Sequence, residues 1–243
     1  MSNSSTSDAK QESTRALRQH LQTAKMLRQT ANAQPGMARD RLRLREWQAA
    51  RLASSHADLA SSERYGKAAQ FFLSDVYGPK DFSARDDEVE RMLPMLVSML
   101  PASALHTIAL AVEVDALTEQ LDSAMISELQ ARQRIANIDE AAYAAAYRKV
   151  GCAAERRRQI QLIRETGEAL ERLASKPLLS GLLKLMRRPA HLAGLGDLQE
   201  FLENGFAAFR HMGDATEFLD RIESKERRLL ENLLSGARQP FRI

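Results

Sequence analysis

The sequence predicts an all-α protein that folds as a single compact, bundle-like domain of about eight to ten helices. Ala, Leu, Arg, Glu and Gln dominate the chain, and these residues favour helices. Only 11 glycines and 7 prolines interrupt its 243 residues. Runs of Val, Ile, Thr and aromatic residues, which favour strands, are nearly absent. Hydrophobic residues make up 44% of the chain, which is enough to build a sizeable core.

The first elements follow from polar and breaking residues. Residues 1–11 are small and polar, so we predict a disordered tail, followed by a helical domain over residues 12–243. The first helix is expected from about Ser13 to Ala33, where the Pro-Gly pair at 35–36 stops it. A second helix is expected over residues 37–54.

The next helix is expected over residues 64–77, because its apolar residues recur at helical spacing. They are Tyr65, Ala68, Ala69, Phe72 and Val76. Gly78 and Pro79 then end the helix. Ser83 with Asp86 matches a capping pattern for another helix, which Pro94 should kink or end.

The longest uncharged run, residues 92–112, approaches the length of a membrane span. Prolines, serines and a histidine interrupt it, so we predict no membrane span. Two buried helices joined at Pro101 account for the run better. The second of them should extend from Ser103 to about Arg134 at the centre of the fold, because its apolar face is wide.

The C-terminal half contains five further predicted helices, with a loop before the last two. Asp139 should cap the first of them, which ends at Gly151. The others are expected over residues 153–175, 178–188, 198–212 and 214–235, and the loop over residues 189–196.

Charge is segregated along the chain, although the net charge is only +3. Lys and Arg outnumber Asp and Glu by 10 to 3 in residues 10–52 and by 11 to 4 in 141–190, whereas acids lead by 15 to 7 in 53–140. Such blocks can pair within one fold, pair across a homodimer, or form solvated helix faces. We do not expect nucleic-acid binding, because the arginines at alternate positions 39–45 spread over a wide arc of a helix.

Motifs for metal, phosphate or covalent catalysis are missing from the sequence. Cys152 is the single cysteine, which excludes an internal disulfide and a Cys-based zinc site and suits a reducing, cytoplasmic location. There is no Glu-x-x-His, no P-loop and no Gly-x-Ser-x-Gly. We therefore predict no cofactor and no metal. Haem ligation by one of the five histidines stays open.

Two groups of residues are candidates for a polar site. Glu113 lies in an apolar stretch seven residues after His106, and burial would make it a candidate acid or base. Alternatively, Glu113 forms an ion pair with an Arg or Lys elsewhere. The second group lies around a predicted turn and is either a ligand pocket or a network that holds the turn. Its members are Asp75, Tyr77, Asp81, Arg85 and Asp86.

Residues 44–86, and within them the pattern FFLxDxYGPKDFxxRD at 71–86, resemble an uncharacterised family of bacterial all-helical proteins. Residues 182–233 resemble the same family. The two stretches cover under half of the chain. The resemblance implies a bacterial, single-domain, helical protein and assigns no catalytic residue.

These observations favour a non-enzymatic, cytoplasmic binding or adaptor protein for a protein partner or a small lipophilic ligand. The phenylalanines at 201, 206, 209 and 218 would form its core or line a groove for the partner. The alternative is an enzyme or cofactor-binding protein with a polar site buried between helices. That site would contain Glu113, His106 and the cluster at residues 75–86.

Overall fold

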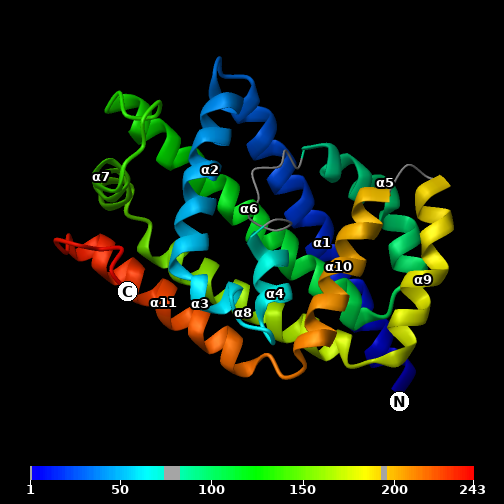
Figure 1. Cartoon of the computed structure of the whole chain (residues 1–243). Coiled ribbons are helices and arrows are strands. Elements are labelled where there is room, and N and C mark those ends of the chain that lie inside the picture. Colours follow the sequence, from blue (N-terminus) through cyan, green and yellow to red (C-terminus); the bar gives the residue numbers. More distant parts are fainter. Residues whose placement is uncertain (1, 74–82, 193–195) are drawn as a thin grey trace.

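The computed structural model describes residues 2–73, 83–192 and 196–243, and these residues form eleven helices and no strand (Figure 1). Nine of the helices in these ranges have seven or more residues, and two are shorter. The prediction of an all-α single domain is confirmed. The bounds are α1 (Ser2–Asn32), α2 (Met37–Ser55), α3 (Ala57–Ala60), α4 (Gly66–Phe71), α5 (Ser83–Met99), α6 (Ala102–Ala131), α7 (Glu140–Val150), α8 (Ala153–Ala174), α9 (Pro177–Leu192), α10 (Gly196–Met212) and α11 (Thr216–Ser235).

Most boundaries agree with the sequence patterns. As expected, α5 and α6 are separate helices on either side of Pro101. The Asp139 side chain accepts a hydrogen bond of 2.7 Å from Ala142 N and so caps α7. Gly151, where we expected this helix to end, has a positive φ of 65°.

Three boundaries differ from the sequence predictions. Helix α1 begins at Ser2, so it covers most of the stretch predicted to be a disordered tail; no Gly or Pro interrupts residues 2–11. Helix α5 continues through Pro94 to Met99. Helix α9 includes Pro189, where we predicted a loop. A proline inside a helix removes one backbone hydrogen bond, and in these two helices the neighbouring turns tolerate that loss.

Helix α6 runs through the middle of the molecule (Figure 1) and contacts α1, α2, α7 and α8. Its wide apolar face is buried on several sides, as the sequence predicts; Leu105, Ile126 and Leu129 are completely buried. Helices α10 and α11 pack on α8 from the other side. Helix α8 therefore connects the central helix α6 with the C-terminal helices α10 and α11.

Two large apolar clusters each include residues of α11. One joins α2, α6, α7 and α11, and there Trp47 stacks on Tyr143 with ring centroids 4.1 Å apart. The other joins α4, α8, α10 and α11 around Phe209 and Phe218, which are both buried. The two phenylalanines belong to the core, and Phe201 and Phe206 pack against it partly buried.

The basic N-terminal block faces the acidic block on α6, and the two blocks form buried ion pairs within the fold. Glu119 is fully buried and its carboxylate lies beside three guanidiniums, with Arg28 Nε 3.2 Å from Oε1 and Arg41 Nε 3.3 Å from Oε2. We call this group the arginine–carboxylate network. Its members are Arg28, Arg41, Arg45, Asp115, Glu119 and Asp122. Pairing within the fold, one of the alternatives left open by the sequence, is therefore what happens here.

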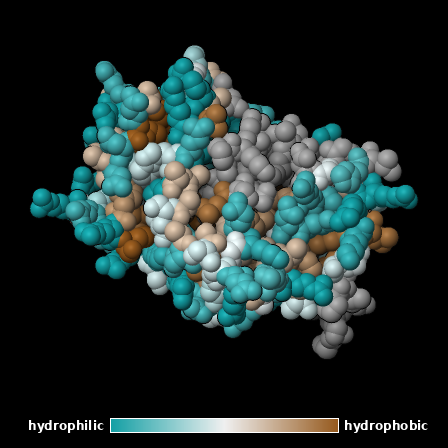
Figure 2. All heavy atoms as spheres, viewed as in Figure 1, coloured by the Kyte–Doolittle hydropathy of each residue, from teal (hydrophilic) through white to brown (hydrophobic). Residues whose placement is uncertain are grey.

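The face shown in Figure 2 is mostly hydrophilic, with smaller apolar patches near its middle and over α9 on the right. Leu185 on α9 is the most exposed large hydrophobic residue in the described ranges, at 71% exposure. Among the helices described, none is both long enough and apolar enough to cross a membrane, as the sequence predicts.

Candidate functional site

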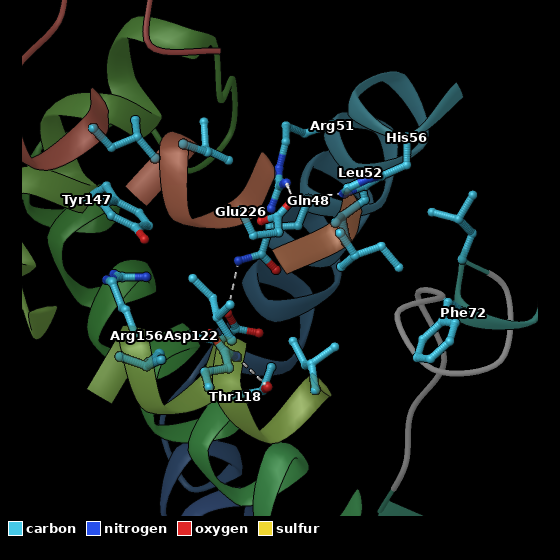
Figure 3. A pocket seen from close by; sticks show the side chains of 18 of the residues that line it. Gln48, Arg51, Leu52, His56, Phe72, Thr118, Asp122, Tyr147, Arg156 and Glu226 are labelled. Atoms are coloured by element: carbon cyan, nitrogen blue, oxygen red, sulfur yellow. Dashed lines mark hydrogen bonds and ion pairs between the residues drawn. The ribbon is translucent and has the colours of Figure 1, made fainter. Parts of the chain in front are cut away.

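A cavity of about 130 Å³ lies between α2, α4, α6, α7, α8 and α11, and we call it the central cavity (Figure 3). One part of its wall is apolar, and the other carries buried polar side chains. The apolar part includes Leu52, Leu59, Phe72, Phe218, Ile222 and Leu229. The polar part includes Gln48, Arg51, His56, Asp122, Arg156 and Glu226.

At one edge of the cavity, Glu226 on α11 is a largely buried acid that lies between Arg51 on α2 and His56 just after α2. Arg51 Nη1 donates to Glu226 Oε1 at 2.6 Å, and His56 Nε2 lies 2.9 Å from the same oxygen. Burial by itself would raise the pKa of Glu226, but attraction to Arg51 and hydrogen bonds from both partners outweigh burial and lower it to about 2. Glu226 is therefore ionised at neutral pH and accepts a hydrogen bond from His56 Nε2.

A second buried acid, Asp122 on α6, belongs both to the cavity wall and to the arginine–carboxylate network. Gln48 Nε2 donates to Asp122 Oδ1 at 3.0 Å, and Arg45 Nε lies 3.8 Å from Oδ2. Burial raises the pKa of Asp122, against the opposing effect of Arg45 and Gln48. One turn before it, Thr118 accepts a hydrogen bond of 2.7 Å from Gln159 on α8. These bonds tie α2, α6 and α8 together around the cavity.

Arg156, in the first turn of α8, is held by the tight connection from α7. Gly151 and Cys152 both have positive φ, 65° and 53°, and this turn presents the Gly151 carbonyl to Arg156 Nε at 2.9 Å. The guanidinium carbon lies 3.5 Å from the centroid of the Tyr147 ring. Arg156 is only 5% exposed. In Figure 3 its guanidinium and the Tyr147 hydroxyl lie side by side at the left of the cavity.

Four buried polar atoms on the cavity wall have no hydrogen-bond partner among the residues described. They are Arg51 Nε, His56 Nδ1, Asp122 Oδ2 and Arg156 Nη2. Buried polar atoms in proteins are nearly always bonded to protein groups or to water. Several such atoms around one cavity therefore indicate a place for a polar ligand group or an ordered water.

The wall also offers two buried phenols. Burial raises the pKa of both Tyr143 and Tyr147, so each hydroxyl stays protonated at neutral pH. The wall therefore combines two guanidiniums and two carboxylates with a histidine, two amides and three neutral hydroxyls. The cavity can accept a hydrogen-bonding ligand with an apolar body.

The predicted acid–base pair lies away from this cavity. Glu113 is on α6 with 27% of its side chain exposed; Arg158 Nη2 donates to its Oε1 at 3.1 Å, and His20 Nε2 is 3.8 Å from Oε2. His106 is exposed on the same helix. Neither lines the central cavity. The geometry of Glu113 matches the ion pair that we considered as the alternative.

The predicted polar cluster falls largely outside the described residues. Asp75, Tyr77 and Asp81 belong to residues 74–82, so their positions are not part of the site. Arg85 and Asp86 lie in the first turns of α5, whose side chains there are also outside the description. The neighbouring Phe72 does line the cavity, at the end opposite Tyr147 (Figure 3).

Sequence reasoning did not single out Arg51, His56, Glu226, Asp122 or Gln48. Each lies in or at the end of a helix, where nothing in the local pattern separates a buried polar residue from a solvated one. Arg156 stands in a run of three arginines, residues 156–158, where nothing in the sequence separates it from its neighbours. The one available signal was Tyr143 and Tyr147, one helical turn apart and followed by the Gly151 turn, which brings an arginine back to the same face.

Metal binding has no support in the described part of the chain, where no three His, Cys, Asp or Glu side chains are grouped to hold an ion. Cys152 is a free thiol.

Comparison with known proteins identifies a family. No curated protein and no solved structure matches the chain significantly. A family model described as a domain of unknown function, DUF8198, matches residues 27–240, from the end of α1 to beyond α11. The match therefore includes every residue of the central cavity. Because it covers most of the chain, the protein belongs to the DUF8198 family.

Proposed function

We propose that the protein binds a small amphipathic organic molecule in the central cavity and does not transform it. The observation that carries the proposal is the composition of the cavity wall. There an apolar surface meets four buried polar atoms that have no hydrogen-bond partner in the described ranges. Ligand sites combine those two features, an apolar lining and a few oriented polar groups. The lipophilic ligand favoured from the sequence fits the apolar part, and its polar end would lie near Arg51 and Arg156.

The experiment is a thermal unfolding series with neutral probes of increasing size, such as hexanol and toluene. A probe at about ten times its Kd should raise the melting temperature by about 3 °C. Replacing Ile160, which lines the cavity, by Phe should abolish that rise because the larger ring fills the space. The matched control is Leu185→Phe on the exposed part of α9. A probe effect that survives Ile160→Phe would contradict the proposal.

A second candidate function is acid–base catalysis in the same cavity. It is favoured by His56, because Glu226 accepts from Nε2 while Nδ1 is buried without a hydrogen-bond partner in the described residues. When His56 is neutral, Nδ1 carries a lone pair and can accept a proton. Recovery of a probe or of a co-purified ligand in altered form, lost in His56→Gln, would favour catalysis over binding alone.

Two broader expectations belong to the same proposal. A single cysteine and a helical fold support a cytoplasmic setting, and the sequence resemblance supports a bacterial origin. A protein partner or a homodimer stays an alternative to the small ligand. Native mass spectrometry of the purified chain separates these outcomes, since a small adduct favours the ligand and a doubled mass favours the dimer.

A further inference from the structure

We infer that the ligand of the central cavity is a small carboxylic acid whose carboxylate binds Arg156. This inference rests on the proposed function and names the chemical class of the ligand. It starts from the charge of the cavity wall.

Arg156 is a buried cation that forms no ion pair with any acid in the part of the chain that the structure describes. Asp122 on the same wall feels its charge, but Asp122 is held by Arg45 and Gln48. Its Nε is occupied by the Gly151 carbonyl, one face of the guanidinium lies against the Tyr147 ring, and Nη2 has no hydrogen-bond partner. Neither the carbonyl nor the ring carries a negative charge. A buried ion of this kind is costly unless an opposite charge joins it.

The acids nearest to the cavity are already matched by other arginines. In the arginine–carboxylate network three guanidiniums face three carboxylates, and Asp122 is one of those three. At another edge of the cavity, Arg51 is paired with Glu226. When these pairs are counted as neutral, the charge of Arg156 is the one positive charge that remains on the cavity wall among the residues described.

One positive charge selects a monoanion. The two Nη atoms form a fork that matches the two oxygens of a carboxylate, and such bidentate pairs are among the stronger hydrogen bonds in proteins. The Tyr147 hydroxyl, kept protonated by burial, lies beside the guanidinium as a further donor (Figure 3). A phosphate monoester carries up to two charges and three acceptor oxygens. It would leave charge unmatched here.

The rest of the ligand must be apolar and small. Ile160, one turn after Arg156 on α8, and Leu121 on α6 line the cavity together with Phe72 and Phe218. An apolar cavity of about 150 Å³ holds one benzene molecule. The central cavity, at about 130 Å³, is of that size. Benzoate and hexanoate are therefore suitable probes.

The test measures the affinity of the full-length protein for benzoate and hexanoate, and for benzamide and hexanamide, by isothermal titration calorimetry. The amides have nearly the same shape without the charge. The acids should bind at least about tenfold more tightly than the amides, because the hydrogen bonds are charge-assisted. Arg156→Gln should remove this difference. Arg157→Gln, the same change at the adjacent exposed position of α8, should keep it.

A second variant covers a failure of Arg156→Gln to fold. Arg156→Lys keeps the charge and loses the fork, so it should reduce the preference for the acids without abolishing it. Equal affinity for acids and amides in the unmodified protein would overturn the inference, as would a preference for acids that persists in Arg156→Gln. Tighter binding of butyl phosphate than of hexanoate would also overturn it.

The result also separates this inference from the proposed function. If hexanol and hexanamide bind and Ile160→Phe blocks them, while the acids bind no better, the cavity is a ligand site and only the carboxylate assignment is wrong. If none of the neutral or anionic probes binds, both proposals are wrong.

Discussion

The arginine–carboxylate network and the wall of the central cavity both contain buried charges, but these charges are paired differently in the two regions. In the network each carboxylate has a guanidinium partner within the fold, and Glu119 lies beside three. In the cavity wall Arg156 contacts a carbonyl and an aromatic ring but forms no ion pair with an acid in the described residues. In a structural network, each buried charge is paired with an opposite charge of the fold. In a binding site, a charge next to empty volume can be paired by a ligand instead.

The difference follows from where the partners come from. Helices α1 and α2 carry the basic block of the sequence and lie against the acidic helix α6, so the arginines of the network pair with the carboxylates of α6. Arg156 comes from the second basic block, and its turn points it toward Tyr147 on α7. Four changes test this contrast, from the largest expected effect to the smallest.

Replacing Glu119 by Ala should be the most damaging change. It leaves the guanidiniums of Arg28, Arg41 and Arg45 without the carboxylate that they share, and breaking a buried ion pair costs about 3–5 kcal/mol. Urea denaturation followed by circular dichroism measures the loss in the free energy of unfolding. The control is Glu128→Ala, because Glu128 pairs with Arg132 at the surface of the same helix and should cost at most about 0.5 kcal/mol. Similar losses for both would contradict the assignment of the network.

Glu226→Gln should cost about 3 kcal/mol at neutral pH. The pKa of Glu226 falls from 4.5 to about 2 on folding, so its ionised form stabilises the folded state at pH values above 4.5. That contribution disappears as the pH falls from 4.5 towards 2. The difference in unfolding free energy between the wild type and the variant should therefore shrink over this interval. A difference that stays constant from pH 7 to pH 3 would contradict the ionised pair.

Arg156→Met should change the stability of the ligand-free protein by less than about 1 kcal/mol. The variant loses the contact with the Tyr147 ring but also removes a buried cation that has no acidic partner in the structure described. The same substitution at Arg28, within the network, is the matched comparison and should cost about 3 kcal/mol. Equal costs at the two sites would remove the distinction between them.

Glu113→Ala should have the smallest effect. Glu113 and its partner Arg158 are both partly exposed, and such pairs contribute about 0.5 kcal/mol. Because Glu113 does not line the central cavity, the rise in melting temperature caused by hexanol should be unchanged. If that rise were lost in Glu113→Ala, Glu113 would have to contribute to ligand binding, and the prediction would be wrong.

The helical elements could be predicted because their signals are local. Residues 103–134 show an apolar face several residues wide, and the structure buries that face on several sides of α6. Pro101 and Asp139 mark boundaries through backbone chemistry that acts within a few residues. A local signal failed at Pro189, where α9 continues through the predicted loop; at Pro94, where we predicted a kink or an end, α5 does not end.

The candidate site could not be predicted in the same way. Arg51 and Glu226 are 175 residues apart, and Gln48 and Asp122 are 74 apart. A charged residue in a helix has the same local pattern whether it faces solvent or a cavity. The two candidates proposed from the sequence were chosen on local composition. One lies away from the cavity, and most of the other lies outside the described residues.

The sequence by itself determined that this chain is helical and where most of its helices begin and end. Periodicity, capping and breaking residues act over a few residues and need no partner from elsewhere. Only the tertiary structure decided which charges meet. Packing α1 and α2 on α6 paired one group of arginines with acids, and packing α8 against α6 and α11 left Arg156 at a cavity. Charge pairing depends on distances between helices, and no local pattern encodes those distances.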